Sequence, residues 1–207
     1  GMVHQHFMLV ESFTAAQNII LGMEPKKGMF VNEAEAVRFT REISKKYNLE
    51  VDAEAVTRTL PVGVKQKIEI LKALARGAEI LILDEPTAVL APQETDQLFD
   101  ELIHLKEQGH TIVFISHKIP EIKRISDRIT VMRASRSVGC YETKDVTEQQ
   151  ISSLIMGCEM DTTIVKTAPK PGDIRIQVEG LSYTDRNQVR VLKDLSFGVR
   201  GGMIFGI

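Results

Sequence analysis

The sequence predicts an α/β fold built on a parallel β-sheet, and three observations lead to this prediction. Residues 80–83 form a run of aliphatic side chains that ends at Asp84, Glu85 and Pro86. A second continuous apolar run follows at 111–115, and helical patterns precede and follow both runs. Short apolar strands that alternate with helices are typical of parallel sheets with helices on their faces.

The first elements predicted are two helices, which together form a small helical layer. Residues 14–21 have a helical pattern that ends at Gly22, and glycine is common just after a helix. Asn32 is a good cap for a longer helix that continues to about Lys46. Apolar residues recur along one side of this second helix, which is otherwise charged.

One helix is predicted before the 80–84 strand and another after it. The first follows a turn at 60–63 and covers residues 64–76. The second starts at Pro92 and ends at Gly109. Their buried faces are predicted to hold Val64, Ile68, Leu71, Leu74 and Ala75 in the first helix and Leu98, Leu102 and Leu105 in the second.

The chain then continues with the same alternation of strands and helices. After the 111–115 strand, a short helix is predicted at 120–125, and residues 128–132 are predicted to form a third strand of the parallel sheet. Residues 137–142 and a helix at 147–156 complete this unit.

These patterns divide the chain into two predicted domains. Residues 1–159 form the first, with a helical subdomain at about 7–60 and a core at about 64–159. Residues 160–172 contain two prolines and no periodicity, which is typical of a linker. Residues 173–207 are predicted to begin a second domain.

The second domain is predicted from strand-like patterns at 174–178, 189–192, 195–199 and 203–207, which indicate antiparallel strands. The sequence begins without an initiator Met and ends within the last of these patterns, so we expect a fragment. Such a fragment would lack strands that pair with the two predicted core strands, and it would leave sheet edges open.

The composition is that of an ordinary globular protein. The 207 residues are 43% hydrophobic and 26% charged, with a formal net charge of −2. Binding to nucleic acid is not expected, because it requires a basic surface stripe. The longest apolar stretches are far shorter than the roughly 20 residues that cross a bilayer. The two cysteines have neither metal-site nor disulfide spacing, so a reducing cytosol is expected.

The adjacent acids Asp84 and Glu85 are the first candidate site residues. In open α/β sheets, ligands bind beyond the carboxyl ends of the strands. Two carboxylates there can divide the work of nucleotide hydrolysis, because Asp84 can hold Mg2+ and Glu85 can orient or deprotonate the attacking water. A buried strand that ends in a solvated acidic turn is the alternative for these residues taken alone.

His117 and Gln5 are the next candidates. His117 follows the 111–115 strand, and a strand–helix–strand crossover brings both strand ends to the same edge of the sheet. An imidazole at that edge can contact a terminal phosphate, although a lone histidine more often has no such role. The amide of Gln5, near the start of the chain, could reach a metal ion or a water molecule.

The order of these features resembles that of the ATP-binding cassette (ABC) ATPases, over nearly all of residues 1–157. The residues of these motifs are most similar to those in the ATPase subunits of bacterial nucleoside and simple-sugar importers, which carry two cassettes in one chain. The matching motifs are Gln5 for the Q-loop, 60–67 for the signature loop, 80–85 for the Walker B strand, 88–91 for the D-loop and His117 for the switch histidine.

The resemblance implies a P-loop NTPase-like core and roles for the candidate residues. Asp84 would bind Mg2+, Glu85 would be the general base, and His117 would contact the γ-phosphate. Gln5 would belong to both the metal site and the catalytic site and would link them to a membrane partner. Tyr183, by its position, would stack on the adenine of ATP in the second cassette.

The signature loop would face the ATP that an opposing cassette holds, with Gly63, Val64 and Gln66 as binding residues. A physical reason for this role exists, because free N–H groups at a helix N-terminus attract phosphate. Two residues depart from the family pattern. Pro61 stands where the signature usually has Ser, and Ala91 stands where the D-loop usually has Asp.

Residues 1–207 contain no phosphate loop of the form G-x-x-x-x-G-K-S/T. Backbone N–H groups of such a loop surround the phosphates, and its Lys reaches the β- and γ-oxygens. By resemblance, one loop would precede Gly1 and another would follow Ile207. We therefore expect the full-length protein to hydrolyse MgATP, and this fragment alone to bind it too weakly to be active.

The resemblance also implies partners and a location. An importer ATPase would contact permease subunits through residues 7–60 and the Q-loop, pair with a second cassette of the same chain or of another copy, and serve an extracellular substrate-binding protein indirectly. It would lie peripherally on the cytoplasmic face of the plasma membrane.

Two alternatives to an importer ATPase remain. They are a cytosolic, non-transport ABC ATPase and a degenerate, non-hydrolytic regulatory cassette. The short linker argues against the first, and intact Asp84, Glu85 and His117 argue against the second.

Overall fold

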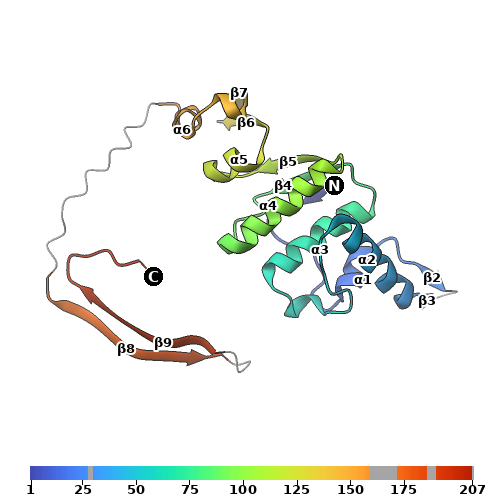
Figure 1. Cartoon of the computed structure of the whole chain (residues 1–207), viewed down its shortest axis with the longest axis horizontal. Helices are drawn as coiled ribbons and strands as arrows, with labels where there is room; N and C mark the ends of the chain where they lie inside the picture. The colour runs from blue at the N-terminus through green and yellow to red at the C-terminus, as the bar shows by residue number, and fades with distance from the viewer. Residues whose placement is uncertain (28–29, 159–171, 186–189, 207) are drawn as a thin grey trace. The chain divides into compact units, whose positions relative to one another are not determined.

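The computed structural model describes residues 1–27, 30–158, 172–185 and 190–206. The chain divides into two compact units, Gly1–Met160 and Asp161–Ile207, and each is described by itself. Figure 1 shows the helices and strands of both units. In the described residues, no helix is both long enough and apolar enough to span a bilayer.

The first unit contains the predicted parallel sheet, which confirms the α/β class. Its strands are β1 (Met2–Val3), β4 (Ile80–Asp84) and β5 (Thr111–Ile115), in the order β1-β4-β5. Both neighbours run parallel to β4. The expectation that β4 would lack a strand partner was therefore wrong, because the short strand β1 pairs with its second edge. Within the described residues, β5 pairs only with β4.

The helices around this sheet follow the predicted pattern with one correction. They are α3 (Val62–Ala75), α4 (Pro92–Glu107) and α5 (Ile119–Ile125). The predicted turn at 60–63 is wrong for its second half, because α3 already begins at Val62. Pro61 is the N-cap residue of α3, a position where its missing N–H removes no helical hydrogen bond.

The predicted helical layer is formed by α1 (Ala15–Ile20) and α2 (Glu33–Tyr47). As predicted, Asn32 caps α2, accepting a hydrogen bond from the backbone N–H of Glu35 (3.3 Å). A short hairpin of β2 (Lys26–Lys27) and β3 (Phe30–Val31) between the helices was not predicted. The 3-10 helix η1 (Thr57–Thr59) leads toward α3.

The third predicted strand lies outside the parallel sheet. Strand β6 (Arg128–Arg133) pairs antiparallel with β7 (Arg136–Glu142) in a separate two-stranded sheet, so the prediction of its sheet partner was wrong. The physical reason is the turn between them, where Ala134 (φ 48°) and Ser135 (φ 61°) are both left-handed. Two such residues form the tight connection that favours a hairpin. The 3-10 helix η2 (Thr143–Asp145) and α6 (Glu148–Met156) complete this unit.

The second unit contains β8 (Ile174–Thr184) and β9 (Arg190–Arg200), which pair antiparallel as predicted. The patterns at 189–192 and 195–199 were expected to be separate strands, but their described residues, 190–192 and 195–199, belong to one strand, β9. The strand predicted at 203–207 was wrong for 203–206, which have no regular structure. Except for Gly172, the predicted linker falls outside the described residues.

The main core of the first unit forms where α3 and α4 pack with the sheet. It contains the predicted apolar residues Ile68, Leu71 and Leu74 of α3 and Leu98, Leu102 and Leu105 of α4, all buried.

A charged pair lies beside this apolar core. Lys67 Nζ is 2.6 Å from Glu101 Oε1, and the two side chains are only 11% and 6% exposed. Burial raises the pKa of Glu101, although Lys67 acts in the opposite direction.

We predict that Lys67→Met lowers the free energy of unfolding by about 3–5 kcal/mol, because it leaves the buried carboxylate of Glu101 without a counter-charge. Arg41→Met is the matched control. Arg41 forms an ion pair with Glu54, and the two side chains are 63% and 66% exposed. That control should change stability by only about 0–1 kcal/mol. Urea denaturation of both variants measures the difference, and equal losses would contradict the prediction.

Candidate functional site

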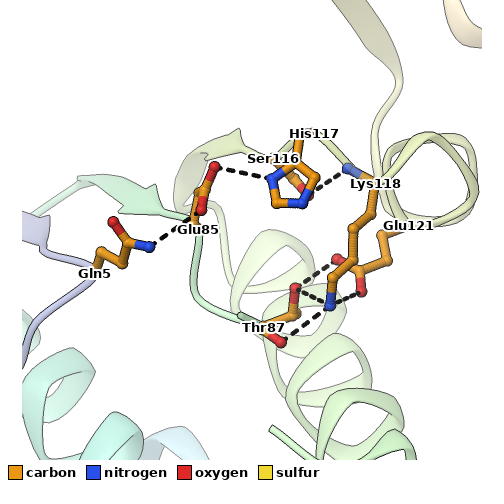
Figure 2. A network of polar contacts seen from close by, with 7 residues as sticks. All are labelled: Gln5, Glu85, Thr87, Ser116, His117, Lys118 and Glu121. Carbon is orange, nitrogen blue, oxygen red and sulfur yellow. Dashed lines mark hydrogen bonds and ion pairs between the residues drawn. The ribbon is translucent and has the colours of Figure 1, made fainter. Parts of the chain in front are cut away.

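Three predicted site residues meet where the parallel strands end. Gln5 follows β1, Glu85 follows β4 directly, and His117 follows β5. Because all three strands run in the same direction, these residues are brought to one edge of the sheet. Figure 2 shows Gln5 and His117 on either side of the Glu85 carboxylate.

The carboxylate of Glu85 accepts a hydrogen bond at each oxygen. Gln5 Nε2 donates to Oε2 (3.2 Å), and His117 Nδ1 lies 2.9 Å from Oε1. Since a carboxylate oxygen can only accept, Nδ1 carries the proton in this contact, which turns Nε2 of the imidazole toward other partners. The side chain of Glu85 is 30% exposed and that of His117 is 70% exposed, so a ligand in solvent can reach both.

The backbone at Glu85 is held in an unusual conformation. Its φ of 46° lies in the left-handed region, which non-glycine residues rarely adopt. Its N–H donates to the carbonyl of Ile115 (2.9 Å), which continues the β4–β5 pairing by one residue. Such strain persists only where the surrounding structure fixes it, and it is concentrated at functional sites.

Asp84 is the last residue of β4, opposite Ile115 in the sheet, and it is half-buried. No group of three or more His, Cys, Asp or Glu side chains in the described part of the chain could hold a metal ion. Mg2+ does not need such a group, because it is usually bound by one or two carboxylates together with substrate phosphates and water. The oxygens of Asp84 and of the Gln5 amide are donors of the kind that this ion prefers.

The predicted binding residues of α3 lie at the start of that helix. The first turn hydrogen bond joins the N–H of Lys65 to the carbonyl of Pro61 (3.1 Å). The N–H groups of the preceding residues, including Gly63 and Val64, therefore have no acceptor within the helix. A Cβ atom at Gly63 would lie 2.8 Å from Glu94 Oε1, so glycine permits this close approach of α3 and α4.

The third predicted residue of this helix, Gln66, is buried and points inward. With Glu101 it lines a cavity of about 80 Å³ between α3 and α4. Gln66 Nε2 and Glu101 Oε2 are buried without a protein hydrogen-bond partner. The cavity is large enough for ordered water, which could satisfy both groups. Gln66 thus lies behind the helix N-terminus, whereas Gly63 and Val64 lie at it.

Tyr183 lies on β8 in the second unit, where it pairs with Leu192 of β9. Its side chain is 54% exposed. It belongs to the second unit, which is described separately from the unit that holds Glu85 and His117.

The sequence did not single out the polar network beside this edge. Thr87 Oγ1 lies 2.5 Å from Glu121 Oε2, and Lys118 Nζ donates to the carbonyl of Thr87 (3.1 Å). Lys118 Nζ also forms an ion pair with Glu121 Oε1 (3.0 Å). Figure 2 shows this network next to the Glu85–His117 contact. The only signal in the sequence is the spacing of Lys118 and Glu121, which places them one turn apart on a helix.

Cys140 is another titratable group outside this edge with a shifted pKa. A hydrogen bond from Thr130 lowers the pKa of the Cys140 thiol, and Arg128 acts in the same direction. Thr130 Oγ1 lies 3.5 Å and Arg128 Nη2 lies 3.3 Å from Cys140 Sγ. The thiol is exposed on β7.

Comparison with protein families gives a match for the part of the chain that includes β1, α3, β4 and the start of the loop after β4. Residues 1–88 match the family described as ABC transporter. The match contains Gln5, Asp84 and Glu85, and it ends before His117.

Curated relatives match the chain along its whole length. It is 42% identical over 207 residues to the nucleoside import ATP-binding protein NupA of Lactococcus lactis subsp. cremoris, and 42% identical over 207 residues to the guanosine import ATP-binding protein NupO of Bacillus subtilis. It is 38% identical over 206 residues to a ribose import ATP-binding protein of Rubrobacter xylanophilus. The chain spans 41% of the length of each of these proteins.

Solved structures share the fold of about 70% of this chain. A dimeric bacterial ABC transporter cassette is similar with a TM-score of 0.56 and 26% identity, over 69% of this chain and 62% of that one. The cbiO1 protein of Clostridium perfringens, part of the ABC transporter complex cbiONQ, is similar with a TM-score of 0.59 and 27% identity, over 70% of this chain and 57% of that one.

We predict that Thr130→Val shifts the alkylation of Cys140 by iodoacetamide to higher pH, because it removes the hydrogen bond that most stabilises the thiolate. The measurement is the labelling rate of Cys140 between about pH 6 and pH 10, followed by peptide mass spectrometry. Labelling of Cys158, which is also exposed, serves as the internal control and should keep its pH profile. An unchanged profile at Cys140 would contradict the prediction.

Proposed function

Because this chain belongs to the ATP-binding cassette family of transporter ATPases, we propose that the protein hydrolyses ATP to power the import of nucleosides or simple sugars through a separate permease. The observation that carries the proposal is the convergence of Gln5, Glu85 and His117 at the carboxyl edge of the parallel sheet. This edge is where α/β sheets bind their ligands.

Glu85 is the proposed general base. Its carboxylate is partly exposed and fixed by donors on both sides, so it can accept a proton from a water molecule at this edge. His117 contacts the terminal phosphate through Nε2, because Nδ1 is engaged with Glu85. The Gln5 amide lies on the opposite side of the carboxylate, where it can orient the same water.

Asp84 and Gln5 are the proposed protein ligands of Mg2+, the cofactor of this reaction. When bound, this ion neutralises the charge that develops on the phosphate oxygens. The backbone of Asp84 is fixed by its pairing with Ile115 of β5, and the two residues before it pair with β1.

The N-terminus of α3 is the proposed contact for the ATP that an opposing cassette holds. Gly63 and Val64 present N–H groups there, and these groups attract phosphate. Pro61 supplies neither a hydroxyl nor an N–H, so this contact depends on the backbone that follows it. Gln66, the third predicted binding residue, is buried behind these groups. At the D-loop, the Ala91 N–H donates to Glu94 Oε2 (3.0 Å), and the methyl side chain of Ala91 offers no polar group to the opposing cassette.

The names of the relatives support the proposed substrate class, and the partners and the location are proposed from the family resemblance. Their names specify import of a nucleoside, guanosine and ribose, which favours a transporter over a cytosolic ATPase without a transport role. We propose that residues 7–60 and Gln5 contact the permease at the cytoplasmic face of the membrane, and that a binding protein outside the cell delivers the substrate. Residues 1–159 then form part of one cassette, 160–172 the linker and 173–207 the first strands of another, with Tyr183 as its adenine contact.

We predict that Glu85→Gln in the complete protein retains ATP binding but lowers the hydrolysis rate by about 10²- to 10⁴-fold, because the amide cannot accept the proton. Phosphate release measures the rate, and nucleotide titration measures binding. Glu79→Gln is the matched control, since Glu79 is an exposed glutamate just before β4, at the opposite end of the strand. It should hydrolyse ATP at the parent rate. Unchanged hydrolysis in Glu85→Gln would reject Glu85 as the base.

A further inference from the structure

Two loops carry Glu85 and His117, and the structure joins these loops a second time. Thr87 follows Glu85 in the loop after β4, and Lys118 follows His117 in the loop after β5. Lys118 Nζ donates to the Thr87 carbonyl (3.1 Å) and lies 3.4 Å from its hydroxyl oxygen. Glu121 completes the network, because its two oxygens meet Thr87 Oγ1 at 2.5 Å and Lys118 Nζ at 3.0 Å.

Thr87 and Glu121 are more enclosed than Glu85 and His117, and Lys118 is more enclosed than His117. Thr87 is 1% exposed, whereas the side chains of Lys118 and Glu121 are 38% and 15% exposed. The Lys118 ammonium points away from Glu85 and toward Thr87 (Figure 2). Its positive charge therefore interacts with the Glu121 carboxylate and the Thr87 carbonyl. A charge-assisted network with shared partners holds its members more firmly than separate exposed contacts do.

The Glu85–His117 contact needs such support for two reasons. The His117 side chain is 70% exposed, so burial does not fix the position of its ring. The backbone of Glu85 is strained at φ 46°, and strain of this kind relaxes unless neighbouring groups oppose it. The network joins the two loops close to these residues, because Thr87 lies two positions after Glu85 and Lys118 directly follows His117.

We infer that Thr87, Lys118 and Glu121 are positioning residues that hold the side chains of Glu85 and His117 in the relative position that ATP hydrolysis requires. This inference rests on the proposed function of Glu85 as the general base. None of the three residues touches the Glu85 carboxylate, so they act through the loops rather than in the proton transfer. Displacement of a reacting group by about 1 Å can lower a rate by about 10²-fold, which sets the scale of the expected effect.

The direct test is Thr87→Val in the complete protein, since valine keeps the shape of the side chain and removes its hydroxyl. The kcat of ATP hydrolysis should fall by about 10- to 100-fold, while the KM for ATP changes by less than about threefold, because the loops are displaced but phosphate binding is kept. Thr87→Ser restores the hydroxyl and should keep kcat within about threefold of the parent. Loss of ATP binding as large as the loss of kcat, or no loss of kcat, would overturn the inference.

A double-mutant cycle separates this inference from the proposed function. In the Glu85→Gln background the base is absent, so adding Thr87→Val should lower the residual rate by less than about twofold. If Thr87→Val lowers that rate by the same factor as in the parent protein, the network does not act through Glu85 and the inference fails alone. If Glu85→Gln itself has the parent rate, the proposed function fails as well.

Lys118→Met and Lys106→Met form the matched pair of charge deletions. Lys106 makes an ion pair of similar length with Asp127 (2.7 Å), in an exposed position between α4 and β6. Lys118→Met should reproduce the kcat loss of Thr87→Val, and Lys106→Met should keep the parent kcat. Thermal unfolding of both variants shows whether each remains folded at the assay temperature. Equal kcat values in the two variants would also overturn the inference.

Discussion

The site depends on the parallel pairing of β4 with a strand on each side. Because β1 and β5 both run in the direction of β4, their carboxyl ends lie beside its own. Each end is followed within two residues by a polar side chain, and these are Gln5, Glu85 and His117. If either neighbour ran antiparallel, its end would lie at the opposite edge and the carboxylate of Glu85 would lose one of its two donors. The strand pairing thus assembles residues that are 80 and 32 positions apart in the chain.

Much of the fold could be predicted from local sequence patterns. The errors arose where the pairing of a strand depends on residues outside that strand. The strands β4 and β5 and the cap of α2 at Asn32 were predicted because apolar runs and capping residues act over a few neighbours. Strand β6 was predicted as a strand but with the wrong partner. Its partner depends on the left-handed turn at Ala134 and Ser135, which contains none of the Gly or Asn residues that usually mark such a turn.

The candidate site shows the same division. The convergence of Glu85 and His117 could be predicted, because the position of a residue after a parallel strand determines the edge at which it lies. The network of Thr87, Lys118 and Glu121 could not, because a lysine that donates to a backbone carbonyl has no sequence pattern of its own. The left-handed backbone of Glu85 was equally hidden, since most left-handed residues are Gly or Asn.

The buried pair of Lys67 and Glu101 has a mechanical consequence. It joins α3 to α4 in the protein interior, so a displacement of one helix stretches or breaks a bond to the other. The amino end of α4 continues directly from the loop that begins at Glu85. The ion pair therefore connects the exposed start of α3, through α4, to the loop that holds the carboxylate.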